Sequence, residues 1–197
     1  MRKLMILLER FFFHFKKPVY PYVHPSAAID GSTTVTDPSN LIMGAHSKIG
    51  NGSYVMNPKA KLILKDYSRC AFGLTVVTGK HPRVIGRFRT MALREEQEAI
   101  NKVMPLDEDV IVEEDTWIGC RTTLLAGVTV HRGATITAGA VVVKDVPPYC
   151  YAGGVPAKFI KFYWSIDEIM EHETKLYPED ERYTREELEK IFAEYQH

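Results

Sequence analysis

A strict six-residue repeat runs without a gap through residues 106–147 and limits what this chain can fold into. Each of seven consecutive hexads begins with an aliphatic residue and carries a small or β-branched residue at its fifth position. The first positions are Leu106, Val112, Ile118, Leu124, Val130, Ile136 and Val142. A period of six matches neither a helix, with about 3.6 residues per turn, nor a long strand, with a period of about 2. It predicts a solenoid of short parallel strands whose aliphatic side chains point inward and stack from coil to coil.

Weaker hexads precede this region in three further registers. Their first positions are Val23, Ile29 and Val35, then Met43, Ile49 and Val55, then Leu64, Cys70 and Val76. The register slips near Leu41 and again across residues 58–62. Insertions in solenoids usually map to loops on one face, so we interpret both slips as widened corners.

The repeat stops across residues 80–105, which contain no hexads. Residues 90–104 have the apolar spacing of a short helix. A long excursion from a compact fold is usually functional. We therefore expect a flap that leaves the solenoid after His81 and returns at Leu106.

Two capping boxes follow the last hexad and predict two C-terminal helices. Ser165 with Glu168 forms the first box, and Thr184 with Glu187 forms the second. We expect these helices to cover the open end of the solenoid, where strand edges are otherwise unpaired. The predicted organisation is an N-terminal segment at 1–20, a β-helix domain at 21–162 with its flap at 80–105, and C-terminal helices at 163–197.

Charge and cysteine content restrict the partners and the compartment. The 197-residue chain has 25 Lys and Arg residues and 25 Asp and Glu residues, which argues against nucleic acid as a main partner. Cys70, Cys120 and Cys150 show no metal-ligand spacing. They are most simply free thiols in a reducing cytoplasm.

The first 17 residues, MRKLMILLERFFFHFKK, are basic and apolar. Their apolar run is broken by Glu9 and Arg10 and is too short to span a bilayer, which needs about 20 apolar residues. Two interpretations stay open. The segment is either a helix packed on the solenoid end or on a neighbouring subunit, or an interfacial helix that holds the protein at the inner face of the membrane.

The hexads, together with AGGVPAKFIK at residues 152–161, resemble the hexapeptide-repeat acyltransferases. The closest resemblance is to the branch with maltose, galactoside, xenobiotic and surface-polysaccharide O-acetyltransferases, and it covers residues 23–162. It implies an all-β fold, a left-handed parallel β-helix with three hexads per coil. It also implies acetyl-coenzyme A as co-substrate, a carbohydrate acceptor, no metal, and a homotrimer with each active site between two subunits.

The resemblance also assigns acceptor-side roles. His81 in TGKHP matches the family's general base, a His followed by Pro at the start of the excursion, and an imidazole suits proton abstraction near neutral pH. Trp117 matches a W-I-G tryptophan that lines the acceptor and thioester site, although a purely structural corner aromatic is the alternative. An Asn upstream of the His holds the sugar in relatives, and both Asn51 and Asn57 are candidates here.

Coenzyme A contacts are carried over in the same way. Gly119, Cys120, Ala138 and Gly139 would line the pantetheine arm, since glycines let an extended ligand approach the backbone. The phosphate-binding candidates are Lys144, Lys158 and Lys161. One departure from the family is Val143, which stands where many relatives have a hydroxyl residue before the first lysine.

The sequence thus predicts an acetyl-coenzyme A-dependent O-acetyltransferase acting on a sugar hydroxyl, in a bacterial surface polysaccharide or its precursor. A small-sugar or antibiotic acetyltransferase is the alternative within the same class. A non-catalytic solenoid and a zinc carbonic anhydrase are more distant alternatives. The zinc enzyme needs three His ligands, and the coils facing His81 offer Trp117 and Cys120 instead.

Overall fold

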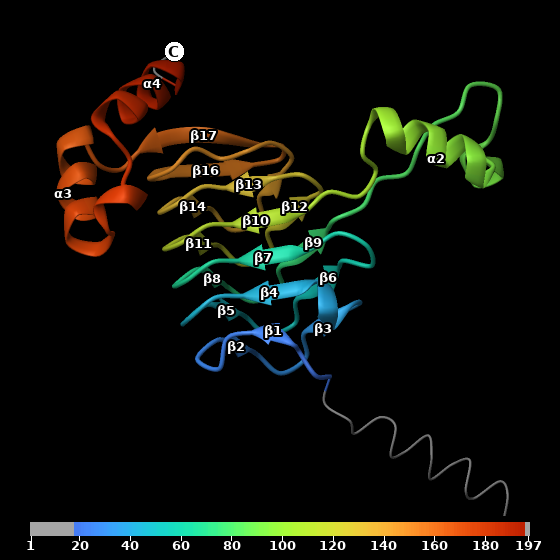
Figure 1. The fold of residues 1–197 in the computed structure, drawn as a ribbon, viewed down its shortest axis with the longest axis horizontal. Helices are drawn as coiled ribbons and strands as arrows, with labels where there is room; N and C mark the ends of the chain where they lie inside the picture. The colour runs from blue at the N-terminus through green and yellow to red at the C-terminus, as the bar shows by residue number, and fades with distance from the viewer. Residues whose placement is uncertain (1–17, 196–197) are drawn as a thin grey trace, which may run out of the picture.

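The computed structural model describes residues 18–195, so the N-terminal segment at 1–17, with its packing and membrane interpretations, lies outside the described residues. Within this range, short strands form three sheets that wrap around a common core (Figure 1). No helix in the same range combines the length and apolar character required to cross a bilayer.

Sheets A, B and C each take one strand from the coils up to β15, and sheet B gains two more strands, β16 and β17, at the C-terminal end. Sheet A contains β1 (Tyr22–Val23), β4 (Leu41–Met43), β7 (Leu62–Leu64), β10 (Val110–Val112) and β13 (Thr129–Val130). Sheet B contains β2 (Ala28–Ile29), β5 (Lys48–Ile49), β8 (Arg69–Cys70), β11 (Trp117–Ile118), β14 (Thr135–Ile136), β16 (Cys150–Gly154) and β17 (Ala157–Phe162). Sheet C contains β3 (Thr34–Val35), β6 (Tyr54–Met56), β9 (Thr75–Val77), β12 (Thr123–Leu125) and β15 (Val141–Val142). The chain visits A, B and C in turn, so the molecule has an A–B, a B–C and a C–A corner.

The core consists of three columns of inward-pointing side chains, as the hexads predict. The column behind sheet B pairs Ile49, Cys70, Ile118 and Ile136 in parallel register, and these four side chains are buried. In sheet A, Met43 pairs with Leu64 and Leu64 with Val112, across both the second slip and the flap. The predicted registers are therefore confirmed.

Both slips occur at the C–A corner, where extra residues widen the turn. The first contains the 3₁₀ turn η1 (Pro38–Asn40), and the second contains the loop after β6. The flap leaves from the same corner one coil later. It contains the 3₁₀ turn η2 (Arg89–Met91) and helix α2 (Arg94–Val103), which confirms the expected helix.

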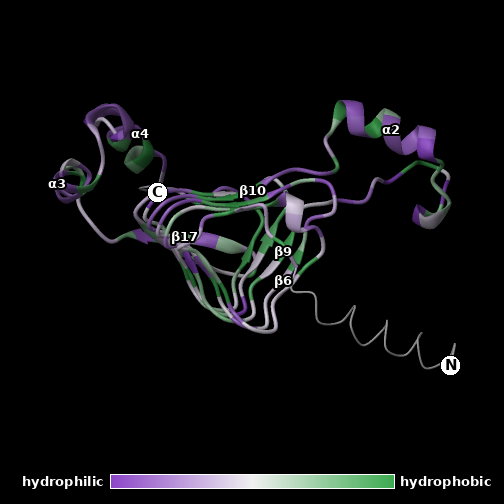
Figure 2. Ribbon diagram, turned by 60° about the horizontal axis from the view of Figure 1, so that its bottom comes forward, coloured by the Kyte–Doolittle hydropathy of each residue, from purple (hydrophilic) through white to green (hydrophobic). Residues whose placement is uncertain are grey.

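The flap projects to one side of the solenoid, away from helices α3 and α4 on the other side (Figures 1 and 2). No residue of α2 is buried, and Ile85, Phe88 and Val103 are largely exposed. Figure 2 shows apolar segments along the flap as well as in the solenoid interior. The flap therefore presents apolar side chains that the described residues of a single chain leave uncovered.

The last coil ends differently from the sequence-based expectation. Strand β16 adds a parallel rung to sheet B on β14, and β17 turns back antiparallel along β16. Phe159 and Phe162 of β17 pack against the core. This hairpin, which the hexad pattern does not predict, covers the end of the core.

Helices α3 (Ile166–Leu176) and α4 (Arg185–Tyr195) start at the two predicted capping boxes, and Ser165 accepts a hydrogen bond from the Glu168 N–H. They lie beside the coils and do not extend across the open end (Figure 1). Phe192 of α4 stacks on Phe162, with ring centroids 3.7 Å apart. The expectation that the helices form the end cover was therefore wrong, because the hairpin fills that place.

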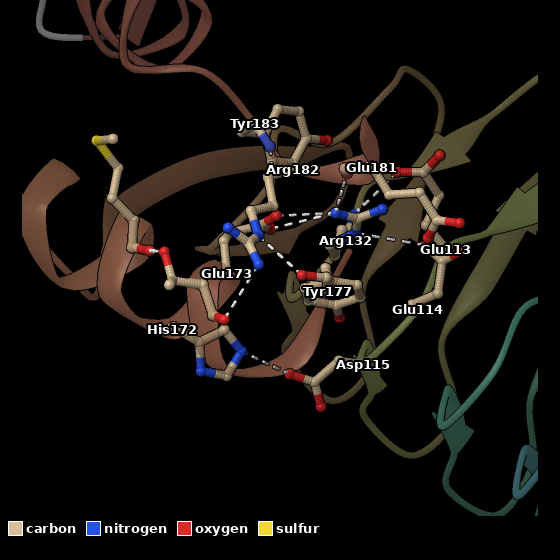
Figure 3. Close-up of polar contacts among 12 residues, drawn as sticks. Glu113, Glu114, Asp115, Arg132, His172, Glu173, Tyr177, Glu181, Arg182 and Tyr183 are labelled. Atoms are coloured by element: carbon tan, nitrogen blue, oxygen red, sulfur yellow. Dashed lines mark hydrogen bonds and ion pairs between the residues drawn. The ribbon is translucent and has the colours of Figure 1, made fainter. Parts of the chain in front are cut away.

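A buried ion pair fastens the helices to the A–B corner (Figure 3). The Glu173 side chain is 1% exposed and accepts hydrogen bonds from Arg132 at 3.0 Å and from the Tyr149 hydroxyl. The Arg132 guanidinium also lies 4.0 Å from the centre of the Tyr177 ring. Arg132 and Tyr149 thus both rely on the Glu173 carboxylate as a hydrogen-bond acceptor in this cluster.

We predict that Glu173→Ala lowers the free energy of unfolding by about 3 kcal/mol, the low end for a broken buried pair. The change removes the nearer carboxylate from Arg132, whose side chain is 12% exposed, and leaves it with Glu114 at 3.5 Å. Urea denaturation measures the effect. The matched control is Glu171→Ala on the exposed face of α3, where the pair with Lys175 is two-thirds exposed and the change should stay within about 0.5 kcal/mol. Equal effects of the two substitutions would show that the buried pair does not hold the helices.

Candidate active site

His81 lies just beyond the neck of the flap, at the C–A corner. The neck is closed by an antiparallel bridge between Gly79 and Asp107 and by a 2.6 Å hydrogen bond from the Lys80 N–H to the Leu106 carbonyl. The Lys80 ammonium pairs with Glu108. His81 itself is exposed, whereas Pro82 is buried. The imidazole therefore stands one residue beyond a fixed anchor and faces outward.

The residues expected to line the pantetheine arm stack along the B–C corner. Gly119 and Cys120 follow β11, and Ala138 and Gly139 follow β14 one coil later. The Gly139 N–H donates to the Cys120 carbonyl at 2.8 Å. Cys120 is half-buried, whereas Ala138 and Gly139 are exposed. Gly119 is buried between the coils, so the accessible strip of small residues consists of Cys120, Ala138 and Gly139.

Gly119 has a structural reason to lack a side chain. Its N–H donates to the Ile136 carbonyl at 2.8 Å, and a Cβ atom there would lie 2.6 Å from the Ala138 nitrogen. The N–H groups of Gly119 and Gly139 are both committed to neighbouring coils. Neither N–H group is therefore free to bond a ligand.

The three lysines do not gather in one place. Lys158 pairs with Gly153, next to Thr137, and so extends the strip at the B–C corner. Lys161 lies further along β17, with its Nζ atom 5.9 Å from the Tyr151 ring. Lys144 follows β15 at the C–A corner, the corner that carries His81. All three lysines are exposed.

Trp117 projects outward from sheet B and is 50% exposed. Its neighbours along the sheet are Arg69 and Thr135. Two further side chains, Phe72 and Arg121, lie at the B–C corner below the strip, with the guanidinium 5.9 Å from the ring centre. Sequence reasoning missed this pair. The repeat register, in which Cys70 pairs with Ile118, could have predicted that Phe72 lies beside Cys120 in the neighbouring coil.

The two candidate asparagines differ. Asn57 is fully buried; its Oδ1 accepts hydrogen bonds from the Thr36 hydroxyl and the Asp37 N–H, and its Nδ2 donates to the Asp37 carbonyl. Its side chain thus closes a corner and is not free for an acceptor. Asn51 is exposed at the B–C corner, where its Oδ1 accepts from Ser32.

The cysteines are free thiols. Burial raises the pKa of Cys70 and of Cys150 to about 12, so neither thiol serves as a nucleophile near neutral pH. Across residues 18–195, no cluster of three or more His, Cys, Asp or Glu side chains is placed to hold a metal ion.

Within one chain, His81 and the B–C strip are therefore separated by the whole width of sheet C. The base candidate and Lys144 occupy the C–A corner, and the small-residue strip with Lys158 occupies the B–C corner. A single chain does not bring the two halves of the predicted site together.

Several solved acyltransferase structures have this architecture. AntD, an N-acyltransferase from Bacillus cereus crystallised with dTDP and coenzyme A, matches with a TM-score of 0.59 and 14% identity over 78% of this chain and 89% of that chain. A maltose O-acetyltransferase from Clostridium difficile matches with a TM-score of 0.57 and 19% identity, over 72% of this chain and 68% of that chain. The polySia-specific acetyltransferase NeuO matches with a TM-score of 0.53 and 23% identity, over 76% of this chain and 73% of that chain.

The chain has the fold of the hexapeptide-repeat acetyltransferases. The prediction of a left-handed parallel β-helix with C-terminal helices is thus confirmed. At sequence identities of 14–23%, these structural matches show that the chain shares the fold, and they do not show which reaction it catalyses.

Sequence comparison also finds acetyltransferases, but these matches cover only about a third of the chain. A tetrahydropyridine-dicarboxylate N-acetyltransferase from Brevibacillus brevis is 44% identical over 72 residues, which cover 36% of this chain and 29% of that protein. A probable macrolide acetyltransferase from Lysinibacillus sphaericus is 44% identical over 66 residues, which cover 34% of this chain and 37% of that protein. The matches span only about a third of the length of these curated relatives. No protein-family model matches the sequence.

Proposed function

We propose that this chain is an acetyl-coenzyme A-dependent O-acetyltransferase that modifies a sugar hydroxyl of a bacterial surface polysaccharide or its precursor. The observation that carries the proposal is the position of His81, exposed at the anchored neck of a flap on an acetyltransferase-type solenoid. Support for a carbohydrate acceptor comes from similarity to a maltose O-acetyltransferase and to NeuO, which is specific for polySia. Acetyl-coenzyme A as donor implies that the reaction occurs in the cytoplasm.

In the proposed reaction, the His81 imidazole removes the proton from the acceptor hydroxyl as its oxygen attacks the acetyl carbonyl carbon. A C–O bond forms, the C–S bond breaks, and the coenzyme A thiolate takes the proton back from His81. Backbone N–H groups or ordered water near the corner would stabilise the oxyanion. Trp117, with half of its surface exposed on sheet B, would cover the acetyl end of the thioester and the sugar ring.

The B–C strip would hold the pantetheine arm. Gly139 and Ala138 are exposed and carry little side-chain bulk, so an extended arm can lie against the coil. Lys158 stands at the upper end of the strip and suits a phosphate group. Lys144 can reach the same phosphates only from the C–A corner of another copy.

The outer face of sheet C supports the proposed association of copies. Met56, Val77 and Leu125 are register partners and form an apolar column there. Met56 is 41% exposed, and Tyr54 of the same strand is 42% exposed. Sheet B carries polar outward residues at the corresponding level, Lys48 and Arg69. Sheet A carries a comparable apolar column, Ile42, Ile63 and Ile111. Only sheet C lies between the two corners that hold the halves of the proposed site, so we assign the contact between copies to sheet C.

If three copies direct sheet C toward a threefold axis, each C–A corner meets the B–C corner of the next copy. His81 and Lys144 of one copy would then face Cys120, Gly139 and Lys158 of its neighbour. A cyclic trimer completes every site with one type of interface. The apolar side chains of the flap would also be covered by the neighbouring copy.

We predict that Leu125→Glu abolishes the trimer and acetyl transfer together, because it puts a charge into the threefold contact. Sedimentation of the wild type should give about three times 22.4 kDa. The matched control is Ala28→Glu, which adds the same charge to the exposed face of sheet B beside Lys48 and should leave the trimer intact. An active monomeric Leu125→Glu protein would refute the shared site.

We predict that His81→Ala keeps the fold and the trimer and lowers kcat by roughly 10²–10⁴-fold, the usual contribution of a general base. Acetyl-coenzyme A turnover against a panel of glycans provides the assay. His24→Ala, an exposed histidine of the first coil, is the control and should keep wild-type kcat. Wild-type kcat in His81→Ala would remove His81 from the mechanism.

We predict that neutralising Lys144 or Lys158 raises the KM for acetyl-coenzyme A several-fold and leaves the acceptor KM nearly unchanged, because both side chains meet only the donor. Lys161→Gln should have the smaller effect, since Lys161 lies away from the strip. Identical responses of all variants to coenzyme A and dephospho-coenzyme A would exclude contacts with the 3′-phosphate.

A small-molecule acceptor is the second candidate function. The curated relatives named for macrolide and chloramphenicol acetylation, at 40–44% identity over short stretches, are the observation that favours it. Turnover with these antibiotics but with no glycan of the panel would establish it in place of the polysaccharide reaction.

A further inference from the structure

A cavity of about 300 Å³ lies at the A–B corner, the corner furthest from sheet C. It is lined by Tyr67, Asp115, Leu176 and Tyr177. Gly119 lies four residue steps after Asp115, or about 13 Å of extended backbone, so the cavity is distinct from the B–C strip. In the proposed trimer this corner points away from the threefold axis and stays open to solvent.

Aromatic and apolar side chains form the walls. Tyr67 is 60% exposed, and its ring stacks on His46 one coil below, with centroids 5.1 Å apart and planes 24° apart. His46, Tyr67 and Asp115 occupy the same corner position in successive coils, all with positive φ. Leu176, also 60% exposed, and Tyr177 come from the end of α3. A wide, supported aromatic face is thus left open to a ligand.

Asp115 contributes the only carboxylate of the lining, and its side chain is 49% exposed. Its backbone N–H donates to the Asp66 carbonyl, whereas its side chain extends toward His172 (Figure 3). The Asp115 Oδ2 to His172 Nε2 distance is 3.7 Å, too long for a hydrogen bond. Asp115 therefore keeps acceptor capacity for a ligand.

The nearby cations are engaged elsewhere. Lys65 pairs with Glu113 at 3.2 Å and with Glu114 at 3.3 Å. Arg132 is bound to Glu173. Arg182 donates to the backbone carbonyls of Tyr177 and Thr174, and Arg69 on sheet B is not part of the lining.

Charges around Tyr177 act on its hydroxyl in both directions. Burial raises the pKa of Tyr177 most, and the carboxylates of Asp115, Glu173 and Glu114 add to this, against the opposing effect of Arg132. The Tyr177 ring thus remains a neutral phenol beside a carboxylate. Arg132 already lies over the Tyr177 ring, so the exposed Tyr67 ring and the Asp115 carboxylate are the groups open to a ligand. A ring face attracts an ammonium group, and a carboxylate accepts its hydrogen bonds.

We infer that this cavity binds a primary ammonium group carried on a small polar ring, and specifically an amino sugar. The sugar ring would pack on Tyr67 and Leu176, and its ammonium group would donate to Asp115. The inference goes beyond acetyl transfer, because the site lies at another corner and its occupancy is measured by binding.

The test compares D-glucosamine, D-glucose and N-acetyl-D-glucosamine by saturation-transfer NMR titration of the full-length protein near neutral pH. D-glucosamine should bind at least about tenfold more tightly than the two uncharged sugars, because only its ammonium pairs with the carboxylate. Equal affinity for all three sugars, or no binding of D-glucosamine, would overturn the inference.

Two variants locate the binding. Asp115→Asn and Tyr67→Asn should each weaken D-glucosamine binding about tenfold or more, and asparagine tolerates the positive φ at both positions. Glu171→Gln removes a carboxylate from the exposed side of α3 and should leave the Kd unchanged. Wild-type affinity in Asp115→Asn would overturn the site, and circular dichroism checks that each variant is folded.

Discussion

The register of the inward-pointing aliphatic side chains is the constraint on which the rest of the structure depends. Ile118 packs in line with Cys70 below it and Ile136 above it, and a slip of one residue would turn each side chain to the opposite face. Because the columns fix every strand, they also fix which residue reaches which corner. The three corners thus acquire different roles although the coils that build them are alike.

The flap corner and the strip corner border the same sheet, and this arrangement is the reason that the proposed site needs two copies of the chain. Sheet C separates His81 from Gly139, and its outer face carries the apolar column that includes Val77. In the proposed trimer, burying that face and joining the two corners would be the same event. The remaining corner carries the ion pair between Arg132 and Glu173, and beside it the open cavity.

Repetition made much of the fold predictable from the sequence, since each coil repeats the same pattern of buried positions. The repeat predicted the buried columns correctly on both sides of each register slip. Capping boxes predicted that the helices start at Ser165 and Thr184. The β16–β17 hairpin and the place of the helices were missed, because they depend on non-repeating contacts such as Phe162 on Phe192. For the same reason the sequence did not reveal that Asn57 is buried.

Complementation between two inactive variants tests the shared site most directly. His81→Ala removes the base at the C–A corner, and Ala138→Trp fills the exposed B–C strip without altering the core. Each homotrimer should be inactive, whereas co-expressed, differently tagged subunits purified as mixed trimers should recover part of the wild-type turnover, because some corners then pair two intact halves. Mixed trimers without activity, although native mass spectrometry shows both subunits, would contradict a site formed between copies.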